Sequence, residues 1–306
     1  MDKPASAAAA PAPVLAPAAP RSASGERWRR GLYRFTRSRL SLLGLAIVAV
    51  LLLLAALGPW ITPWPEHVSG SVNLTDKFLA PSARYWFGTN EVGQDIFSLT
   101  VAGARISLLA GVAVVVAAAL IGTVLGAIAG YLGGWVDEAI MRVTDLVLTL
   151  PSLILAMAIA ASLGAGIVNA TLAITLSWWP GFCRLVRGEV MARKNEVYVQ
   201  AALCCGAGPL RIVFRHILPN IVSPLVVKMS LDLGFAILTV ASLGFVGIGV
   251  KPPQPEWGAM LSTARAYMPD QWWVAVFPGM AIFLAVFGFN LLGDGLRDVL
   301  DPRARR

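Results

Sequence analysis

Two charged side chains in a long apolar run are the first candidates for chemistry in this chain. Lys228 and Asp232 lie four residues apart, so a helix places them on one face. A single unpaired charge inside a membrane costs roughly 2.5 to 3.5 kcal/mol, so these side chains must pair or face water. Two interpretations stay open: the pair lines a translocation path for a zwitterionic substrate, or the two charges only neutralise each other inside a helix bundle.

Enzymatic and metal chemistry has little support. The two histidines, His67 and His216, stand far apart, which argues against a metal cluster or a Ser-His pair in the membrane. No G-x-x-x-x-G-K-S/T loop is present to hold a nucleotide phosphate. The three cysteines include an adjacent pair but no C-x-x-C, and they predict reduced structural thiols. We therefore expect a chain that is not an enzyme, holds no cofactor or metal, and takes its energy from another subunit.

A different kind of site is suggested by the stretch VQAALCCGAGPLRIVFRHILPN, residues 199–220, which separates two apolar runs. Asn195 is expected to cap a helix over residues 196–205, and Gly206 to end it in the left-handed conformation. Pro209 would then open a second helix running towards Pro219. The sequence thus predicts a short helix-turn-helix elbow.

The first helix of this elbow has a surface suited to close contact. Val197, Ala201 and Cys204 fall on one stripe at helical spacing. Ala201 and Ala202 have side chains small enough to let another surface approach. We interpret the segment as a docking elbow for a cytoplasmic partner, and the alternative is a surface helix that packs on its own bundle.

The composition indicates which elements hold these residues. The chain is 57% hydrophobic and 14% charged, with a mean hydropathy of +0.70, which is typical of an integral membrane protein. Its net charge of +8 comes from basic residues at the edges of apolar segments. This placement suits orientation in membrane lipid and not nucleic-acid binding.

Six apolar segments are long enough to cross a bilayer as helices. They run from about Leu40 to Ile61, Ile106 to Gly130, Met141 to Leu163, Val168 to Val186, Ile221 to Val250 and Trp273 to Leu292. The third passes through Pro151, and the fourth is expected to break near its end at Trp-Trp-Pro-Gly. By the positive-inside rule, both termini and the elbow lie in the cytoplasm and residues 62–104 lie outside.

Three smaller patterns receive local interpretations. Gly122, Gly126 and Gly130 form a small-residue face in the second span, expected to pack within the chain, with a subunit contact as the alternative. The charged group at residues 137–145 is interpreted as a solvated helix start. The proline-rich turn at residues 252–257 either covers the outer mouth of a pore or caps helix ends.

The elbow resembles a known signature. Ala201, Ala202, Gly206, Leu218 and Pro219 match the E-A-A-x3-G-x9-I-x-L-P pattern of permease subunits of binding-protein-dependent ABC importers. Gln200 stands where that family has Glu, and His216 where the general pattern has Ile. The runs GTNEVGQDIFS, GARISL, GFVGIGVKPPQPEWGAML and FNLLGDGLRDVLDPR also resemble the C-type permease of dipeptide, oligopeptide and nickel importers.

This resemblance implies an all-α membrane protein with six transmembrane helices and the type I importer permease fold. Its parts would be an N-terminal tail (1–39, disordered to about 25), a first helix (40–61), an outer loop (62–104), a five-helix core (105–295) with the elbow at 195–219, and a C-terminal tail (296–306). The elbow would be the coupling helix that contacts the ATPase, through Gln200, Ala201, Ala202, Gly206, Ala207, Pro209, Leu210 and Arg211.

The resemblance also implies partners and a location. The chain would form half of a pore in the bacterial inner membrane, together with a second, homologous permease, two ATP-binding subunits and an extracytoplasmic substrate-binding protein. The transported class would be di- or oligopeptides. The rival interpretation is an ion-coupled secondary transporter that uses Lys228 and Asp232 as its switch.

Overall fold

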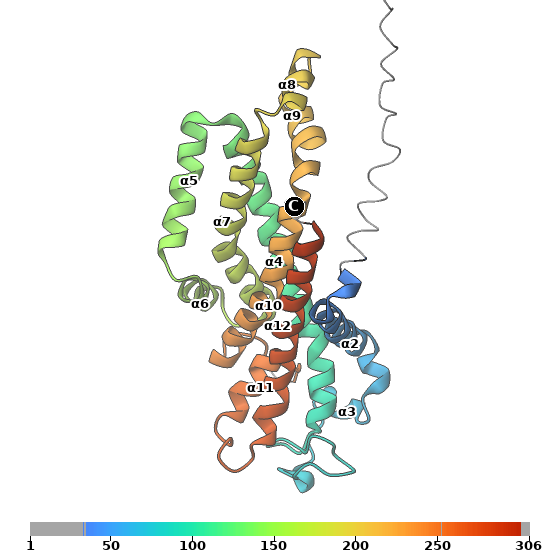
Figure 1. The fold of residues 1–306 in the computed structure, drawn as a ribbon. Helices are drawn as coiled ribbons and strands as arrows, with labels where there is room; N and C mark the ends of the chain where they lie inside the picture. Colours follow the sequence, from blue (N-terminus) through green and yellow to red (C-terminus); the bar gives the residue numbers. More distant parts are fainter. Residues whose placement is uncertain (1–32, 34, 252, 301–306) are drawn as a thin grey trace, which may run out of the picture.

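The computed structural model describes residues 33, 35–251 and 253–300, and these form helices joined by loops (Figure 1). The helices are α2 (Arg39–Ile61), α3 (Pro65–Val68), α4 (Ile96–Leu132), α5 (Gly134–Thr149), α6 (Ser152–Leu163), α7 (Ile167–Arg193), α8 (Val197–Cys204), α9 (Pro209–Ile212), α10 (Leu218–Val246), α11 (Trp257–Ala264) and α12 (Trp273–Leu300). A 3-10 turn covers Leu74–Asp76, and a π-helical segment covers Val213–Ile217. The described residues contain no named strand, so the all-α class is confirmed. The expected disordered tail up to about residue 25 lies outside the described residues.

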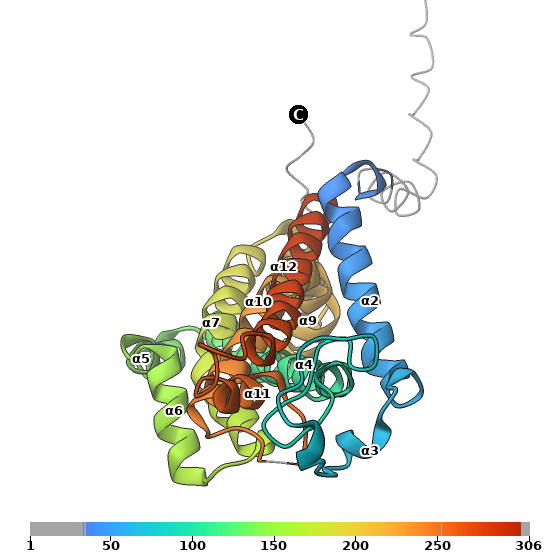
Figure 2. The ribbon, with the colours of Figure 1, turned by 90° about the horizontal axis from the view of Figure 1, so that it is seen from below.

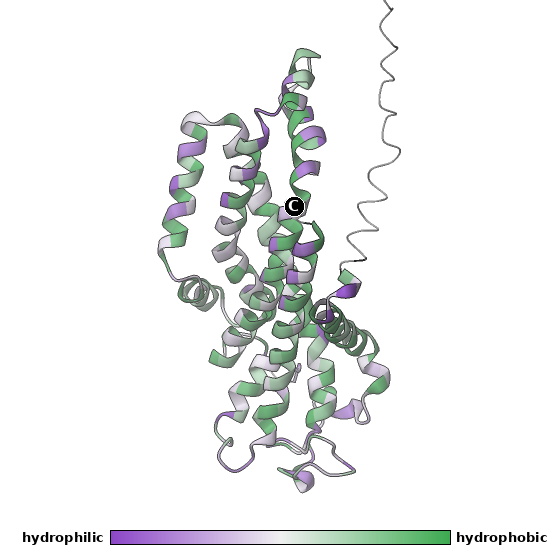
Figure 3. Cartoon of the chain, viewed as in Figure 1, coloured by the Kyte–Doolittle hydropathy of each residue, from purple (hydrophilic) through white to green (hydrophobic). Residues whose placement is uncertain are grey.

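Four helices in the described part of the chain are long and apolar enough to cross a membrane. They are α2, α4, the continuous helix Pro209–Val246 and α12. The pair α5 and α6 gives a fifth span if the two are counted together. Apolar residues dominate these helices, and hydrophilic residues gather at the ends of the bundle and on α5 (Figure 3).

The third expected span is not one straight helix. α5 and α6 meet at an angle of 92°, and the break falls at Pro151. Leu150, which precedes the proline, is extended at ψ 137°. A proline disfavours helical backbone at the residue before it, and this explains the bend.

The break expected in the fourth span is also wrong, because α7 continues through Pro180 to Arg193. α7 packs along α4 over the glycine stripe of that helix. A Cβ on Gly122 would lie 2.5 Å from Phe182 Cβ, and one on Gly130 would lie 2.8 Å from the Arg187 carbonyl oxygen. The glycine stripe therefore packs within the chain, and this contact holds α7 in one piece although Pro180 removes a backbone donor.

The two ends of the bundle carry different features. α8 and α9 lie at one end, and α11 and the loop that follows α3 lie at the opposite end (Figure 1). α2 runs along α12 when the molecule is viewed from below (Figure 2). Gly44 and Gly288 let these two helices approach closely, because a Cβ on Gly288 would lie 2.7 Å from Ile47.

Candidate coupling surface and polar sites

The elbow begins at α8, whose N-cap is Glu196 and not Asn195 as expected. The Glu196 side chain makes no capping hydrogen bond. α8 is instead held by burial: Val199 is 1% exposed and packs in an apolar cluster with Val186, Val190 and Ile212. Tertiary packing has therefore overridden the local capping preference.

Gly206 ends α8 as the sequence predicts. Its φ is +78°, in the left-handed region. The Ala207 N–H donates to the Ala202 carbonyl at 3.0 Å, and the Gly206 N–H donates to the Leu203 carbonyl at 2.9 Å. This is a Schellman motif, which satisfies two carbonyls at the helix end. A Cβ on Gly206 would meet nothing within 4 Å, so the turn opens onto free surface.

Pro209 opens the second helix, also as predicted. This helix does not stop at Pro219, however, because α9, the π-helical segment and α10 form one continuous helix from Pro209 to Val246. The Leu218 N–H donates to the carbonyl of Val213, five residues earlier. The side-chain amide of Asn220 donates to the His216 carbonyl at 2.7 Å. These contacts let the helix continue past a proline that has no N–H to donate.

All eight residues assigned to coupling lie on accessible surface. Gln200, Ala201, Gly206, Pro209, Leu210 and Arg211 are exposed, and Ala202 and Ala207 are half-buried. The predicted stripe faces outward, since Val197 is 82% exposed. A groove of about 500 Å³ runs between α8 and the next helix. Small and basic side chains make up most of its lining, which consists of Tyr198, Ala201, Ala202, Cys205, Ala207, Arg211, Arg215 and His216. One side of the elbow therefore packs on the bundle, and its other side is accessible to a partner.

Lys228 and Asp232 form the ion pair that the sequence allowed. The ammonium lies 2.9 Å from a carboxylate oxygen, and the side chains are 32% and 19% exposed. Lys228 Nζ also lies 5.0 Å from the centre of the Phe182 ring on α7, a cation–π contact. The two charges neutralise each other while remaining partly accessible, so the pairing alone does not separate the two interpretations.

Sequence reasoning missed a second set of ion pairs, between α5 and α7. Arg187 binds Asp137 through two contacts of 2.5 and 2.6 Å, and Arg184 binds Asp145 at 2.6 Å. The charged group at residues 137–145 is therefore not simply a solvated helix start. The sequence shows two acids in one segment and two arginines in another, but their spacings of eight and three residues differ, so the pattern did not indicate that they pair.

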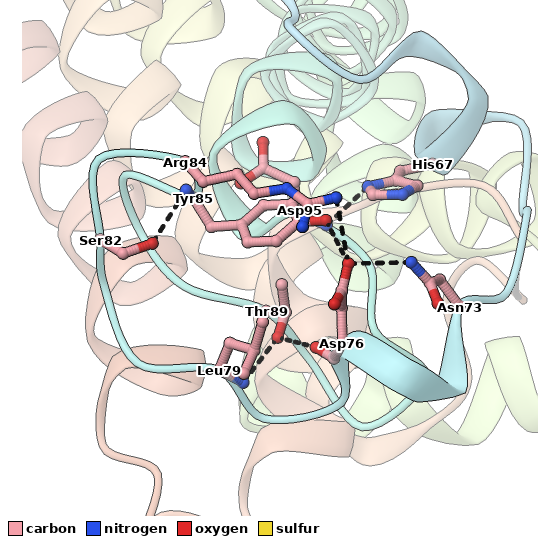
Figure 4. Close-up of polar contacts among 9 residues, drawn as sticks. All are labelled: His67, Asn73, Asp76, Leu79, Ser82, Arg84, Tyr85, Thr89 and Asp95. Atoms are coloured by element: carbon pink, nitrogen blue, oxygen red, sulfur yellow. Dashed lines mark hydrogen bonds and ion pairs between the residues drawn. The ribbon is translucent and has the colours of Figure 1, made fainter.

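The outer loop carries a polar cluster that the sequence did not indicate (Figure 4). The Tyr85 hydroxyl donates to Asp76 at 2.7 Å, and Arg84 lies 3.4 Å from the same carboxylate. Burial of Tyr85 and its bond to Asp76 raise the pKa of the phenol to about 12. His67 accepts the Asp95 N–H at 3.0 Å. These contacts fix the loop ahead of α4, where Asp95 caps the helix by accepting from Ser98 N–H at 2.8 Å.

Glu256 gives the proline-rich turn a structural role. Its buried carboxylate accepts the N–H groups of Gly258 and Ala259 at 2.8 Å and caps α11. The Ser107 hydroxyl on α4 donates to it at 3.3 Å. Burial raises the pKa of Glu256, and the three donors oppose that shift. The helix-capping interpretation of residues 252–257 therefore accounts for Glu256.

Among the described residues, no group of three His, Cys, Asp or Glu side chains is placed to hold a metal ion. Cys183 is buried, and Cys204 and Cys205 are exposed, all three as free thiols.

Comparison with known proteins gives matches over nearly the whole chain. Residues 122–306 match the family described as binding-protein-dependent transport system inner membrane component. Residues 26–81 match the N-terminal TM domain of oligopeptide transport permease C.

Three relatives illustrate the similarity. The chain is 46% identical to the probable D,D-dipeptide transport system permease protein DdpC of Escherichia coli K12, over 87% of this chain and 89% of that protein. It is 44% identical to the glutathione transport system permease protein GsiD of Escherichia coli O157:H7, over 96% and 95%. It is 41% identical to the dipeptide transport system permease protein DppC of Alkalihalophilus pseudofirmus, over 91% and 90%.

Proposed function

The chain belongs to the family of binding-protein-dependent transport system inner membrane components, and we propose that it forms half of the pore of an ATP-driven peptide importer. It is a permease subunit of the inner membrane and not an enzyme. A permease of this kind works with ATP-binding and substrate-binding subunits. The substrates named for its relatives are a D,D-dipeptide, glutathione and dipeptides, so we assign di- or oligopeptides to this chain.

The elbow is the proposed contact with the ATP-binding subunits. The observation that carries this assignment is the Gly206 turn, which opens onto free surface beside an accessible groove lined in part by Ala201 and Ala202. Small side chains allow close approach of a partner, while Val199 and Ile212 fix the base of the elbow to the bundle. One elbow provides one coupling site. Two ATP-binding subunits therefore call for a second, homologous permease, and an extracytoplasmic binding protein completes the importer.

The proposed topology has six spans with both termini and the elbow in the cytoplasm. α7 and the bent pair of α5 and α6 count as spans, since the charges that lower the hydropathy of α7 are paired with those of α5. The position of α8 and the outer loop at opposite ends of the bundle supports this arrangement (Figure 1). Basic residues at the elbow end, among them Arg193 and Lys194, agree with the positive-inside rule.

Reconstitution tests the function directly. The purified chain in proteoliposomes should neither hydrolyse ATP nor take up labelled peptide by itself, because the sequence has no phosphate-binding loop. Adding the two ATP-binding subunits, the second permease and the binding protein should give ATP-dependent uptake. Proton-driven peptide uptake by this chain alone would overturn the proposal in favour of a secondary transporter.

A further inference from the structure

We infer that one polar face shared by α5, α7 and α10 forms the wall of a water-filled path for a zwitterionic peptide. The residues of this polar face are Arg142, Asp145, Arg184, Gly188, Lys228 and Asp232. The inference rests on the proposed function and extends it, because it assigns the side of the chain along which the substrate passes.

The stripe along α7 connects the other two helices. Gly181, Arg184 and Gly188 lie three, four and seven residues apart, so they share one face of α7. At Gly181 this face meets α10, because a Cβ added to Gly181 would lie 3.7 Å from Lys228 Cε. At Arg184 it meets α5, through the 2.6 Å contact with Asp145. Figure 1 shows α7 between α5 and α10, and α7 is in contact with both helices.

The Asp145–Arg184 pair on this surface is accessible, unlike the second ion pair between α5 and α7, Asp137–Arg187. The Lys228–Asp232 pair on α10 is only partly accessible, at 32% and 19%. Asp145 and Arg184 are 59% and 58% exposed in their side chains. By contrast, Asp137 and Arg187 are only 15% and 29% exposed and act as a tether between the helices. Arg142 and Glu138 add a second accessible pair, 3.2 Å apart, to α5. Gly188 has nothing within 4 Å of a Cβ, so no other part of the described chain covers the surface there.

The depth of these charges excludes hydrocarbon as their neighbour. Counting from Arg193 at the elbow end of α7, Arg184 lies about 14 Å and Gly181 about 18 Å along the helix at 1.5 Å per residue. The hydrocarbon core of a bilayer is about 30 Å thick, which places Lys228, beside Gly181, near its middle. Each charge facing lipid there would cost roughly 2.5 to 3.5 kcal/mol. The polar face must therefore meet water or a protein surface.

The alternation of charges favours water and a passing peptide. Each basic side chain of the face lies beside an acidic one: Arg142 beside Glu138, Arg184 beside Asp145 and Lys228 beside Asp232. A peptide carries a positive and a negative end and many backbone dipoles. It can therefore exchange contacts along such a surface without being held tightly at any one position. In contrast, α4 exposes an apolar stripe that includes Leu120 and Val124, which suits lipid or an apolar partner.

Thiol accessibility tests the inference in the complete reconstituted importer. In a parent whose three cysteines are replaced, single cysteines are placed as Gly188→Cys on the polar face and as Thr149→Cys beside it. Thr149 is exposed and lies four residues after Asp145, on the same face of α5. Matched controls on the apolar stripe of α4 are Leu120→Cys and Val124→Cys, at residues that are 64% and 56% exposed. A charged, water-soluble methanethiosulfonate should modify the polar-face thiols at least roughly tenfold faster, because only a thiol in water ionises to the reactive thiolate. Transported peptide with binding protein and ATP should change that rate.

The outcomes separate this inference from the proposed function. Equal, slow reaction at both faces in proteoliposomes that take up peptide would refute the path while leaving the importer assignment intact. Fast reaction at the polar face that transported peptide does not alter would also refute it, since the water there would not be the substrate's path. Failure of the unmodified chain to transport with all its partners present would overturn the proposed function itself, and this inference with it.

Discussion

Replacing Gly206 by valine should disable the elbow while leaving the membrane bundle intact. The glycine sits at φ +78° between two hydrogen bonds of the Schellman motif. A β-branched side chain is disfavoured in this conformation, because its Cβ crowds the neighbouring carbonyl. The rest of the chain offers no clash, since a Cβ at this position meets nothing within 4 Å. The perturbation is therefore confined to the turn.

The size of the effect follows from that geometry. A non-glycine residue held in a strained conformation costs of order 1 to 3 kcal/mol. This corresponds to a roughly 5- to 150-fold loss in the fraction of elbows that keep the native turn. The bundle is anchored elsewhere, through the Gly122 and Gly130 contacts of α4 with α7, so the amount of inserted protein should not fall. We expect uptake to be lost and co-purification of the ATP-binding subunits to weaken.

Two matched controls separate backbone strain from added bulk. Gly208 also has nothing within 4 Å of a Cβ, but its backbone is extended, at φ −72° and ψ 163°. Gly208→Val therefore adds the same side chain two residues away with little strain and should retain uptake. Gly206→Asn places a polar side chain of similar size in a conformation that asparagine tolerates, and it should retain much of the activity.

The assay compares peptide uptake and bound ATP-binding subunits at equal membrane levels of each variant. Normal uptake by Gly206→Val would remove the docking role from this elbow. Equal loss in Gly206→Val and Gly208→Val would contradict the conformational reasoning and assign the effect to side-chain bulk in the interface.

Four other outcomes are expected. A cysteine at Arg193 should resist an impermeant reagent added to intact cells, whereas one at the exposed Val72 should react; the reverse pattern would invert the topology. Gln200→Glu, which restores the family residue, should leave uptake unchanged in the same transport assay. Glu256→Ala should lower the thermal stability of the purified importer by about 0.5 to 2 kcal/mol, since two N–H groups at the start of α11 lose their acceptor. The pKa of Tyr85 rises from 10.0 to about 12 in the folded chain, so the stability contributed by its neutral phenol is complete below pH 10 and is lost as the pH rises through 12; absorbance titration should show this phenolate step disappearing in Tyr85→Phe.

Features set by local backbone chemistry could be predicted from the sequence. Gly206 and Pro209 have few conformational options, and both occupy the positions expected of them. The identity of α2 as an apolar span was equally clear, because its 23 residues carry almost no polar interruption. These predictions needed no knowledge of neighbouring helices.

Features set by tertiary contacts could not be predicted. Pro180 and Pro151 look alike in the sequence, yet α7 passes through the first and the chain bends by 92° at the second. The difference lies in packing, since α7 is held against the glycine stripe of α4 while Pro151 joins two helices with largely exposed residues. Likewise, hydropathy counts Arg184 and Arg187 as separate charges and cannot register their partners on α5.

The continuous helix from Pro209 to Val246 has a mechanical consequence. The elbow is joined to the Lys228–Asp232 pair by a single rod, about 28 Å long at 1.5 Å per residue, with no slack loop between them. A tilt imposed on the elbow end of this helix is transmitted towards the ion pair along continuous helical backbone. The wider π turn at Val213–Ile217 interrupts the regular hydrogen-bond ladder, so it is the joint at which bending costs least. A change that stiffens or straightens the π-helical segment would alter how far the Lys228–Asp232 pair moves for a given movement of the elbow, without changing the residues of either.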